Sequence, residues 1–123
     1  MTARTTVCSA SGIEEKRHEW TTLDPGEDPS RGAQLAVLGG EAGVAVLLVD
    51  LEPGGLIALH SSKDASICHV IEGDGTLFFA GGDEIDFARG DTIEFAPDVA
   101  HGWNGGRERA LILVATYSGR HEE

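Results

Sequence analysis

The sequence is poor in cationic residues, aromatic residues and cysteine, and it contains no long apolar run. It has 9 Lys and Arg residues against 21 Asp and Glu residues, which gives a formal net charge of -12 at pH 7. A negative charge repels the phosphate backbone of nucleic acids and the anionic headgroups of membranes. We therefore expect no nucleic acid and no membrane as a partner. A small anionic substrate stays open, because one local arginine or metal ion can outweigh a screened overall field.

The two cysteines, Cys8 and Cys68, are too few for a disulfide framework and suit a reducing compartment. No stretch approaches the ~18 consecutive apolar residues that a membrane-spanning helix needs. The opening run MTARTTVCSASG lacks the apolar core of a secretory signal peptide. Together these absences predict a cytoplasmic protein.

Glycine and short apolar runs are abundant instead. With 123 residues, of which 41% are hydrophobic, the chain is the size of one domain. From residue 33 onward, runs such as VAVLLVDL, LIALH and SICHVIE alternate with turn segments such as EPGG and GDG, and no helical stripe is present. This pattern predicts about nine or ten short strands. We expect an all-β fold, an antiparallel barrel or sandwich over residues 33–118, followed by a disordered tail at 119–123.

Residues 1–32 have a different pattern and are expected to form a flexible N-terminal segment. Ser11 and Glu14 have the spacing of a capping box, which predicts a short helix through Arg17. The run HEWTTL, residues 18–23, is better suited to a strand. Residues 24–32, DPGEDPSRG, are typical of a surface loop.

Two glycine-punctuated stretches each supply a histidine. Gly54 is followed by His60 after five residues, and Gly73 closes this first stretch. Gly90 opens the second stretch, and His101 follows it at a separation of eleven residues. These stretches resemble the two sequence motifs of the cupin superfamily of small β-barrels. The resemblance implies a single conserved cupin barrel, also described as a double-stranded β-helix or jelly roll, with His60 and His101 at its centre.

The resemblance also implies a divalent transition metal, zinc or else iron, manganese, nickel or copper. Cupins commonly hold such a metal with two histidines and a glutamate from the first motif and a histidine from the second. His60 and His101 match two of these four positions, whereas Ser62 and Ser66 replace the other histidine and the glutamate. The second motif departs further at three positions, where Ala96 replaces proline, Asp98 replaces glycine, and Asn104 lies one residue early.

Cys68 is a candidate for a third metal ligand. If position 66 faces the barrel interior, strand alternation turns Cys68 and Val70 inward and His69 outward. A set of His60, Cys68 and His101 would suit zinc or copper and leave a fourth position open. The alternative is that Cys68 is a small buried apolar residue.

Three further residues are expected to line the substrate pocket. Trp103 lies two residues after His101 and should share its face, where it could stack on a ligand or simply fill the barrel. Ser62 and Ser66 would be small polar lining residues, or solvated loop residues. Without a metal, His60 and His101 would still be candidates for catalytic acid and base, because imidazole titrates near neutral pH.

Two hypotheses about function follow. The first is a small-molecule enzyme whose His60 and His101 hold a metal or exchange protons with substrate, with isomerase, cyclase or lyase chemistry rather than oxygenase chemistry. The second is a binding or sensor module that holds a small molecule without a metal and without turnover. The resemblance further implies a homodimer, in which residues 18–23 could be exchanged between subunits.

Overall fold

The computed structural model describes residues 3–23, 30–40 and 43–118, and these residues form strands and no helix. The strands are β1 (Ala3–Ser9), β2 (Gly12–His18), β3 (Thr21–Thr22), β4 (Arg31–Gly39), β5 (Val44–His60), β6 (Ala65–Glu72), β7 (Asp74–Phe79), β8 (Glu84–Ala88), β9 (Thr92–Phe95), β10 (His101–Gly105) and β11 (Ala110–Tyr117). The predicted all-β class is therefore confirmed. In the part of the chain that the structure describes, no helix is long and apolar enough to cross a membrane.

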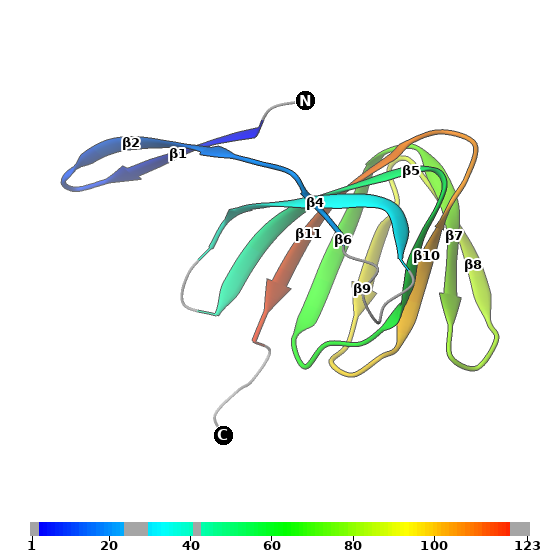
Figure 1. The fold of residues 1–123 in the computed structure, drawn as a ribbon. Helices are drawn as coiled ribbons and strands as arrows, with labels where there is room; N and C mark the ends of the chain where they lie inside the picture. The colour runs from blue at the N-terminus through cyan, green and yellow to red at the C-terminus, as the bar shows by residue number, and fades with distance from the viewer. Residues whose placement is uncertain (1–2, 24–29, 41–42, 119–123) are drawn as a thin grey trace, which may run out of the picture.

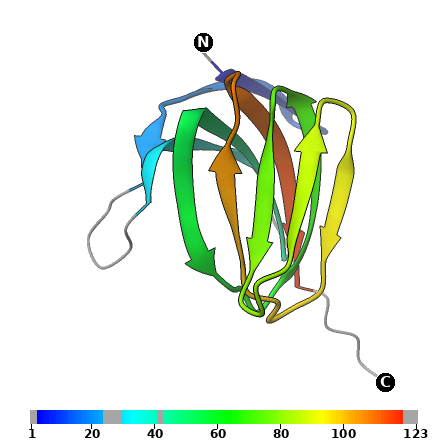
Figure 2. The ribbon, with the colours of Figure 1, turned by 90° about the vertical axis from the view of Figure 1, so that its right-hand side faces the viewer.

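Strands β3 to β11 form one antiparallel sheet that curls into an open barrel (Figures 1 and 2). The long strand β5 joins the two sides of this barrel. Its first part, residues 44–51, pairs with β11, whereas Ile57 and His60 near its end pair with β10. The two strands expected at residues 44–51 and 56–60 are thus one bent strand, and EPGG is a bend within it rather than a turn.

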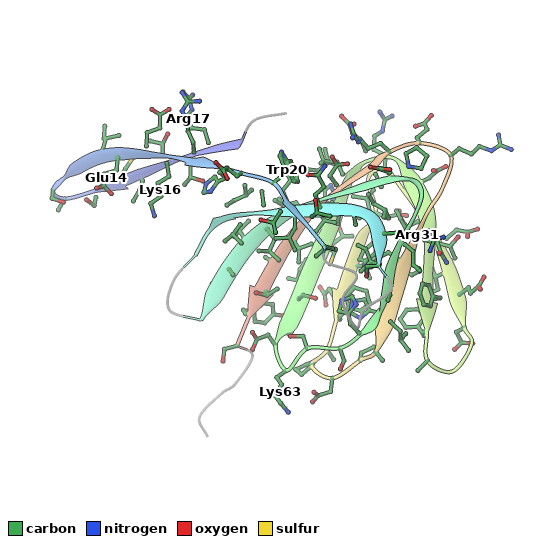
Figure 3. The ribbon with its side chains drawn as sticks, viewed as in Figure 1. Glu14, Lys16, Arg17, Trp20, Arg31 and Lys63 are labelled. Atoms are coloured by element: carbon green, nitrogen blue, oxygen red, sulfur yellow. The ribbon has the colours of Figure 1, made fainter. Side chains whose placement is uncertain are left out.

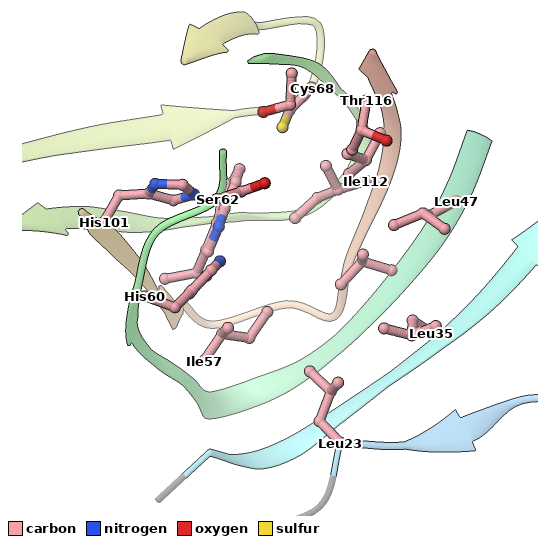
Figure 4. Close-up of a pocket in the computed structure, with 14 residues that line it drawn as sticks. Leu23, Leu35, Leu47, Ile57, His60, Ser62, Cys68, His101, Ile112 and Thr116 are labelled. Carbon is pink, nitrogen blue, oxygen red and sulfur yellow. The ribbon is translucent and has the colours of Figure 1, made fainter. Parts of the chain in front are cut away.

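The inner surface of the barrel is apolar because alternate residues of each strand point inward. On the first side, β4, β5, β11 and β6 supply these residues, and on the second side β7, β8 and β10 do so. The buried core consists of Ala33, Leu51, Ile57, Cys68, Val70, Leu77, Phe87, Phe95, Trp103, Ala110 and Ile112. One rim of the barrel remains open to a cavity beside this core (Figure 4).

The N-terminal segment is a β-hairpin, and the helix predicted through Arg17 is wrong. β1 pairs with β2 along its whole length, from the Ala3–His18 pair to the Ser9–Gly12 pair. Gly12 at the turn has a φ of 138°, which glycine adopts readily. The ladder satisfies more backbone groups than one short helix would, so it overrides the local capping signal. The hairpin extends away from the barrel, and Glu14, Lys16 and Arg17 project from it (Figures 1 and 3).

Residues 18–23 contribute the ends of two strands. Thr21 and Thr22 pair with Leu35 and Gln34 of β4 in the same chain, which confirms part of the expected strand. Leu23 continues this edge by donating its amide hydrogen to the carbonyl of Ala33 over 3.0 Å. Residues 24–29 of the expected loop and the expected disordered tail at 119–123 lie outside the described residues.

Candidate functional site

Strands β5 and β10 place His60 and His101 side by side. The two residues are direct partners in the antiparallel register, which puts their side chains on the same face of the sheet. Their ring centroids lie 4.6 Å apart, and the ring planes are tilted by 54°. A bulge follows between His101 and Trp103. Two histidines separated by forty residues in sequence therefore form one pair at the barrel mouth.

Both rings are oriented by a backbone carbonyl two residues earlier. His60 Nδ1 lies 2.8 Å from the carbonyl oxygen of Ala58, and His101 Nδ1 lies 2.9 Å from that of Val99. A carbonyl oxygen only accepts hydrogen bonds, so each Nδ1 carries the hydrogen and donates it. In the neutral ring, Nε2 then bears the free lone pair. The pair thus presents two basic nitrogens.

His101 occupies the more enclosed position. Its ring stacks on Phe95 with centroids 3.7 Å apart and planes within 9°, and Trp103 meets it edge-on at 6.4 Å. Burial lowers the pKa of His101, and the neighbouring His60 lowers it further, although the hydrogen bond to Val99 opposes these effects. The neutral form of His101 is therefore more favoured than that of an exposed histidine. His60, in contrast, is exposed to solvent.

The histidine pair forms the polar end of a cavity of about 310 Å³ (Figure 4). The side-chain oxygen atoms of its lining are the hydroxyls of Ser62, Ser66 and Thr116. None of the described lining residues is Asp, Glu, Lys or Arg. The remaining walls come from Leu23, Leu35, Leu47, Val49, Ile57, Cys68, Trp103, Ile112 and Val114. The cavity is an apolar slot with one hydrogen-bonding end.

All the residues expected at the site line this cavity, but they do not play equal parts. Trp103 is 5% exposed and packs edge-on against Phe87, so it fills the barrel as well as lining the cavity. Cys68 faces inward as strand alternation predicts, and Ser66 hydrogen-bonds to it. His69 faces the other way and contacts the Thr92 hydroxyl at 2.8 Å.

The chain is similar to one protein family and to several solved structures. The model of the Cupin domain matches residues 47–116, which include both histidines, all of β6 to β10 and most of β5 and β11. The chain belongs to the cupin family. The double-stranded barrel and the central position of the two histidines agree with this membership, and so confirm the resemblance seen in the sequence.

Solved cupin structures share the fold at low sequence identity. The polyketide cyclase RemF from Streptomyces resistomycificus superimposes with a TM-score of 0.72 at 18% identity, covering 85% of this chain and 72% of that one. KdgF from a Halomonas species gives 0.69 at 17% identity, covering 84% and 90%. A cupin 2 conserved barrel protein from Rhodopseudomonas palustris gives 0.72 at 15% identity, covering 95% and 82%. No curated protein matched the sequence.

The donor atoms of this cupin do not fit a metal held by three protein ligands. Within residues 3–23, 30–40 and 43–118, no three His, Cys, Asp or Glu side chains lie close enough together to hold one ion. The set of His60, Cys68 and His101 is therefore not assembled. Burial also raises the pKa of the Cys68 thiol to about 11, with Ser66 partly offsetting the rise, so the thiolate that metals prefer is disfavoured.

Two residues that the sequence did not single out support this cupin site. Thr116 lines the cavity two residues beyond Val114 on β11, a position that strand alternation could have found. Ser30 is 2% exposed, and its hydroxyl accepts a hydrogen bond from the Ala58 amide over 2.9 Å. Since Ala58 also holds the His60 ring through its carbonyl, Ser30 is a positioning residue for His60. Ser30 lies within residues 24–32, which the sequence predicts as a surface loop, so this role had no signal in the sequence; the structure buries Ser30 and begins β4 at Arg31.

The loops that carry the two histidines are also tied together. The Asp98 amide donates to the Ser62 carbonyl over 2.7 Å, joining the turn after β9 to the turn after β5. Asp98 has a φ of 71°, a conformation that aspartate tolerates better than most residues. This explains how the cupin glycine position accepts aspartate in this chain.

We expect Ser30→Ala to destabilise the fold by about 1–3 kcal/mol, because it leaves a buried amide without its acceptor. It should also shift the ring signals of His60 in NMR spectra, since it frees the Ala58 amide, which is next along the backbone to the carbonyl that orients the ring. Urea unfolding and histidine-selective NMR would measure both effects. Ser11→Ala in the exposed hairpin turn is the control and should change neither. A destabilised protein with unchanged His60 signals would contradict the positioning role.

Proposed function

We propose that this protein is a small-molecule enzyme that moves a proton on an organic substrate bound in the barrel. The reaction would belong to the isomerase, cyclase or lyase type. The observation that carries this proposal is the pair of Nε2 bases at the only strongly polar end of an apolar cavity, within the described lining residues. A general base at such a site typically accelerates proton transfer by 10²–10⁴-fold.

The two histidines would divide the work according to their surroundings. His101, held neutral by burial, would accept a proton at Nε2 from a carbon next to a substrate carbonyl. His60, nearer to solvent, would in its protonated form donate a proton from Nε2 to the substrate oxygen, giving an enol. Returning a proton to another carbon completes an isomerisation, and loss of a neighbouring leaving group completes a lyase reaction. No oxidant or reductant is needed.

The similar structures support this reaction type without identifying the substrate. RemF is named as a polyketide cyclase, so this fold hosts cyclisation in at least one protein. At 18% identity the likeness extends to the fold alone. The assignment to this chain therefore depends on the histidine pair and on the experiment below.

Solvent deuterium exchange would test the proposal without knowledge of the natural substrate. 2-Tetralone and cyclohexanone carry exchangeable hydrogens next to a carbonyl and are neutral at pH 7. Each would be incubated with the protein in D₂O, and NMR would follow the loss of those hydrogens. We expect exchange at least about 100-fold faster than in buffer. Binding detected by calorimetry without any accelerated exchange would contradict the enzyme and favour the second candidate.

The second candidate is a binding or sensor module. The absence of a three-ligand metal group among the described residues favours it, because a cupin that only holds a ligand needs no metal. Such a protein would bind the same ketones with no exchange. Elemental analysis of protein purified without a histidine tag would show whether the histidine pair also carries a divalent ion, and His101→Ala should remove any such ion.

We also propose a cytoplasmic location, because Cys8 and Cys68 are free thiols, which suit a reducing compartment.

We also propose a homodimer in which the β1–β2 hairpin packs on a second copy. The hairpin exposes Ile13 by 75% and Val7 by 37%, and an isolated two-stranded hairpin is marginally stable in water. Residues 18–23, which lead from the hairpin into β3, are the segment expected to cross between subunits.

Light scattering coupled to size exclusion should therefore give about twice the 12.9 kDa monomer mass. Ile13→Glu should weaken the dimer by at least about tenfold, because it places a charge in an apolar contact. Ser9→Glu, on the opposite face of the same hairpin, is a control for added charge. A wild-type monomer at high concentration would contradict this proposal.

A further inference from the structure

The neutral histidine pair presents hydrogen-bond acceptors and no donors to the cavity. Both His60 and His101 use Nδ1 to donate to backbone carbonyls, which leaves two Nε2 atoms as acceptors in the neutral pair. The hydroxyls of Ser62, Ser66 and Thr116 rotate and can either donate or accept. A ligand at this end is therefore best matched when it brings a donor of its own, such as a hydroxyl group.

The cavity lacks the groups that would compensate a negative charge. Its described lining contains no lysine or arginine. Lys63 projects from the outside of the loop after β5 (Figure 3). A carboxylate or phosphate placed in the slot would lose its hydration without gaining a cation, which costs several kcal/mol. Burial of the His101 ring, which lowers its pKa, also makes a compensating positive charge on it unfavourable.

The remaining surface of the cavity is apolar. Leu23, Leu35 and Leu47 line one part of it, and Ile57 and Trp103 line another. Its volume of about 310 Å³ lies at the lower end of ligand pockets, which suits a molecule of one or a few rings rather than a long chain. Leu23, Leu35 and Leu47 point toward the same space that the two histidines border (Figure 4).

We propose that the ligand of this site is a neutral, largely apolar ring compound that carries a phenolic or enolic hydroxyl, which donates to the histidine pair. The inference rests on the proposed function, because an enol is the species that proton transfer at this pair would form. It goes further by excluding carboxylates and phosphates as the main substrate class.

Three naphthalene derivatives of almost the same size test this inference by calorimetry at pH 7. They are 2-naphthol, which offers a hydroxyl donor, 2-methoxynaphthalene, which does not, and 2-naphthoate, which is an anion. We expect 2-naphthol to bind at least about tenfold more tightly than either of the others. Tighter binding of 2-naphthoate, or equal binding of 2-naphthol and 2-methoxynaphthalene, would overturn the inference.

Variants locate the effect. The double variant His60→Leu with His101→Leu should abolish the preference for 2-naphthol over 2-methoxynaphthalene, because it removes both Nε2 acceptors and keeps the apolar wall. His69→Leu is the matched control on the other face of β6 and should keep the preference. If this double variant does not fold, as judged by circular dichroism, His60→Leu and His101→Leu should each still reduce the preference, because each removes one of the two acceptors. A preference that survives removal of the acceptor would also overturn the inference.

These binding measurements are independent of turnover. Selective binding of 2-naphthol without deuterium exchange of ketones would uphold the ligand class and reject the enzyme. Deuterium exchange accompanied by selective binding of 2-naphthoate would uphold the enzyme and reject the ligand class.

Discussion

Replacing both histidines, His60→Gln with His101→Gln, is expected to reduce ketone deuterium exchange by at least about 100-fold. General acid and base catalysis is usually worth 10²–10⁴-fold, and this variant removes both groups while keeping similar side-chain volumes. The two rings lie 4.6 Å apart and would act on the same substrate. Because groups that act as a unit are strongly non-additive, each single variant should lose nearly as much as the double variant.

The control for this prediction is another histidine of the same strand system. His69→Gln changes a ring that contacts Thr92 on the outer face of β6 and does not line the cavity. It should leave the exchange rate within about twofold of the wild-type rate. An equal loss in His69→Gln, or full activity in the double variant, would show that the histidine pair is not the catalytic centre.

The fold could be predicted from the sequence because its signals are local and repeated. Short apolar runs, glycine turns and the two histidine stretches all indicate the same barrel. The two stretches indicated that His60 and His101 lie together, but the two residues meet as register partners on the neighbouring strands β5 and β10 and not on strands that face each other. Strand alternation also placed Ser66 and Cys68 inside and His69 outside.

The rest depends on distances and long-range contacts that alternation leaves undetermined. Cys68 faces the cavity, but it belongs to β6, which pairs with β11 and β9, whereas the histidines lie where β5 pairs with β10. Facing one cavity from opposite sides does not bring donors within reach of one ion. The role of Ser30 also could not be predicted from strand alternation, because its hydrogen bond to Ala58 joins residues 28 apart in sequence.

The N-terminal hairpin was missed for a different physical reason. Its strands are largely exposed on both faces, so they carry no apolar alternation. The capping-box spacing of Ser11 and Glu14 was the strongest local signal, yet the pairing of β1 with β2 is the structure that forms.

The second large effect is expected at Gly73, the last glycine of the first motif. Gly73→Ala should destabilise the fold by at least about 3 kcal/mol, which is severe for a single substitution. Gly73 has a φ of 90°, and a Cβ at this position would overlap the carbonyl of Arg109 and the Cα of Ala110. These are backbone atoms at the start of β11, so no side-chain rotation could relieve the overlap.

Two other glycines serve as controls that separate the steric overlap at Gly73 from the strain of its positive φ. Gly82 has a φ of 98° but open space around its Cβ position, so Gly82→Ala should cost only the conformational strain of about 1–2 kcal/mol. Gly39 in β4 has open space and no positive φ, so Gly39→Ala should be neutral or slightly stabilising. Urea unfolding would rank the three variants, and failure of Gly73→Ala to accumulate as folded protein would agree with the prediction. If Gly73→Ala and Gly82→Ala lost the same stability, the close approach of β11 would not be the reason for glycine at this motif position.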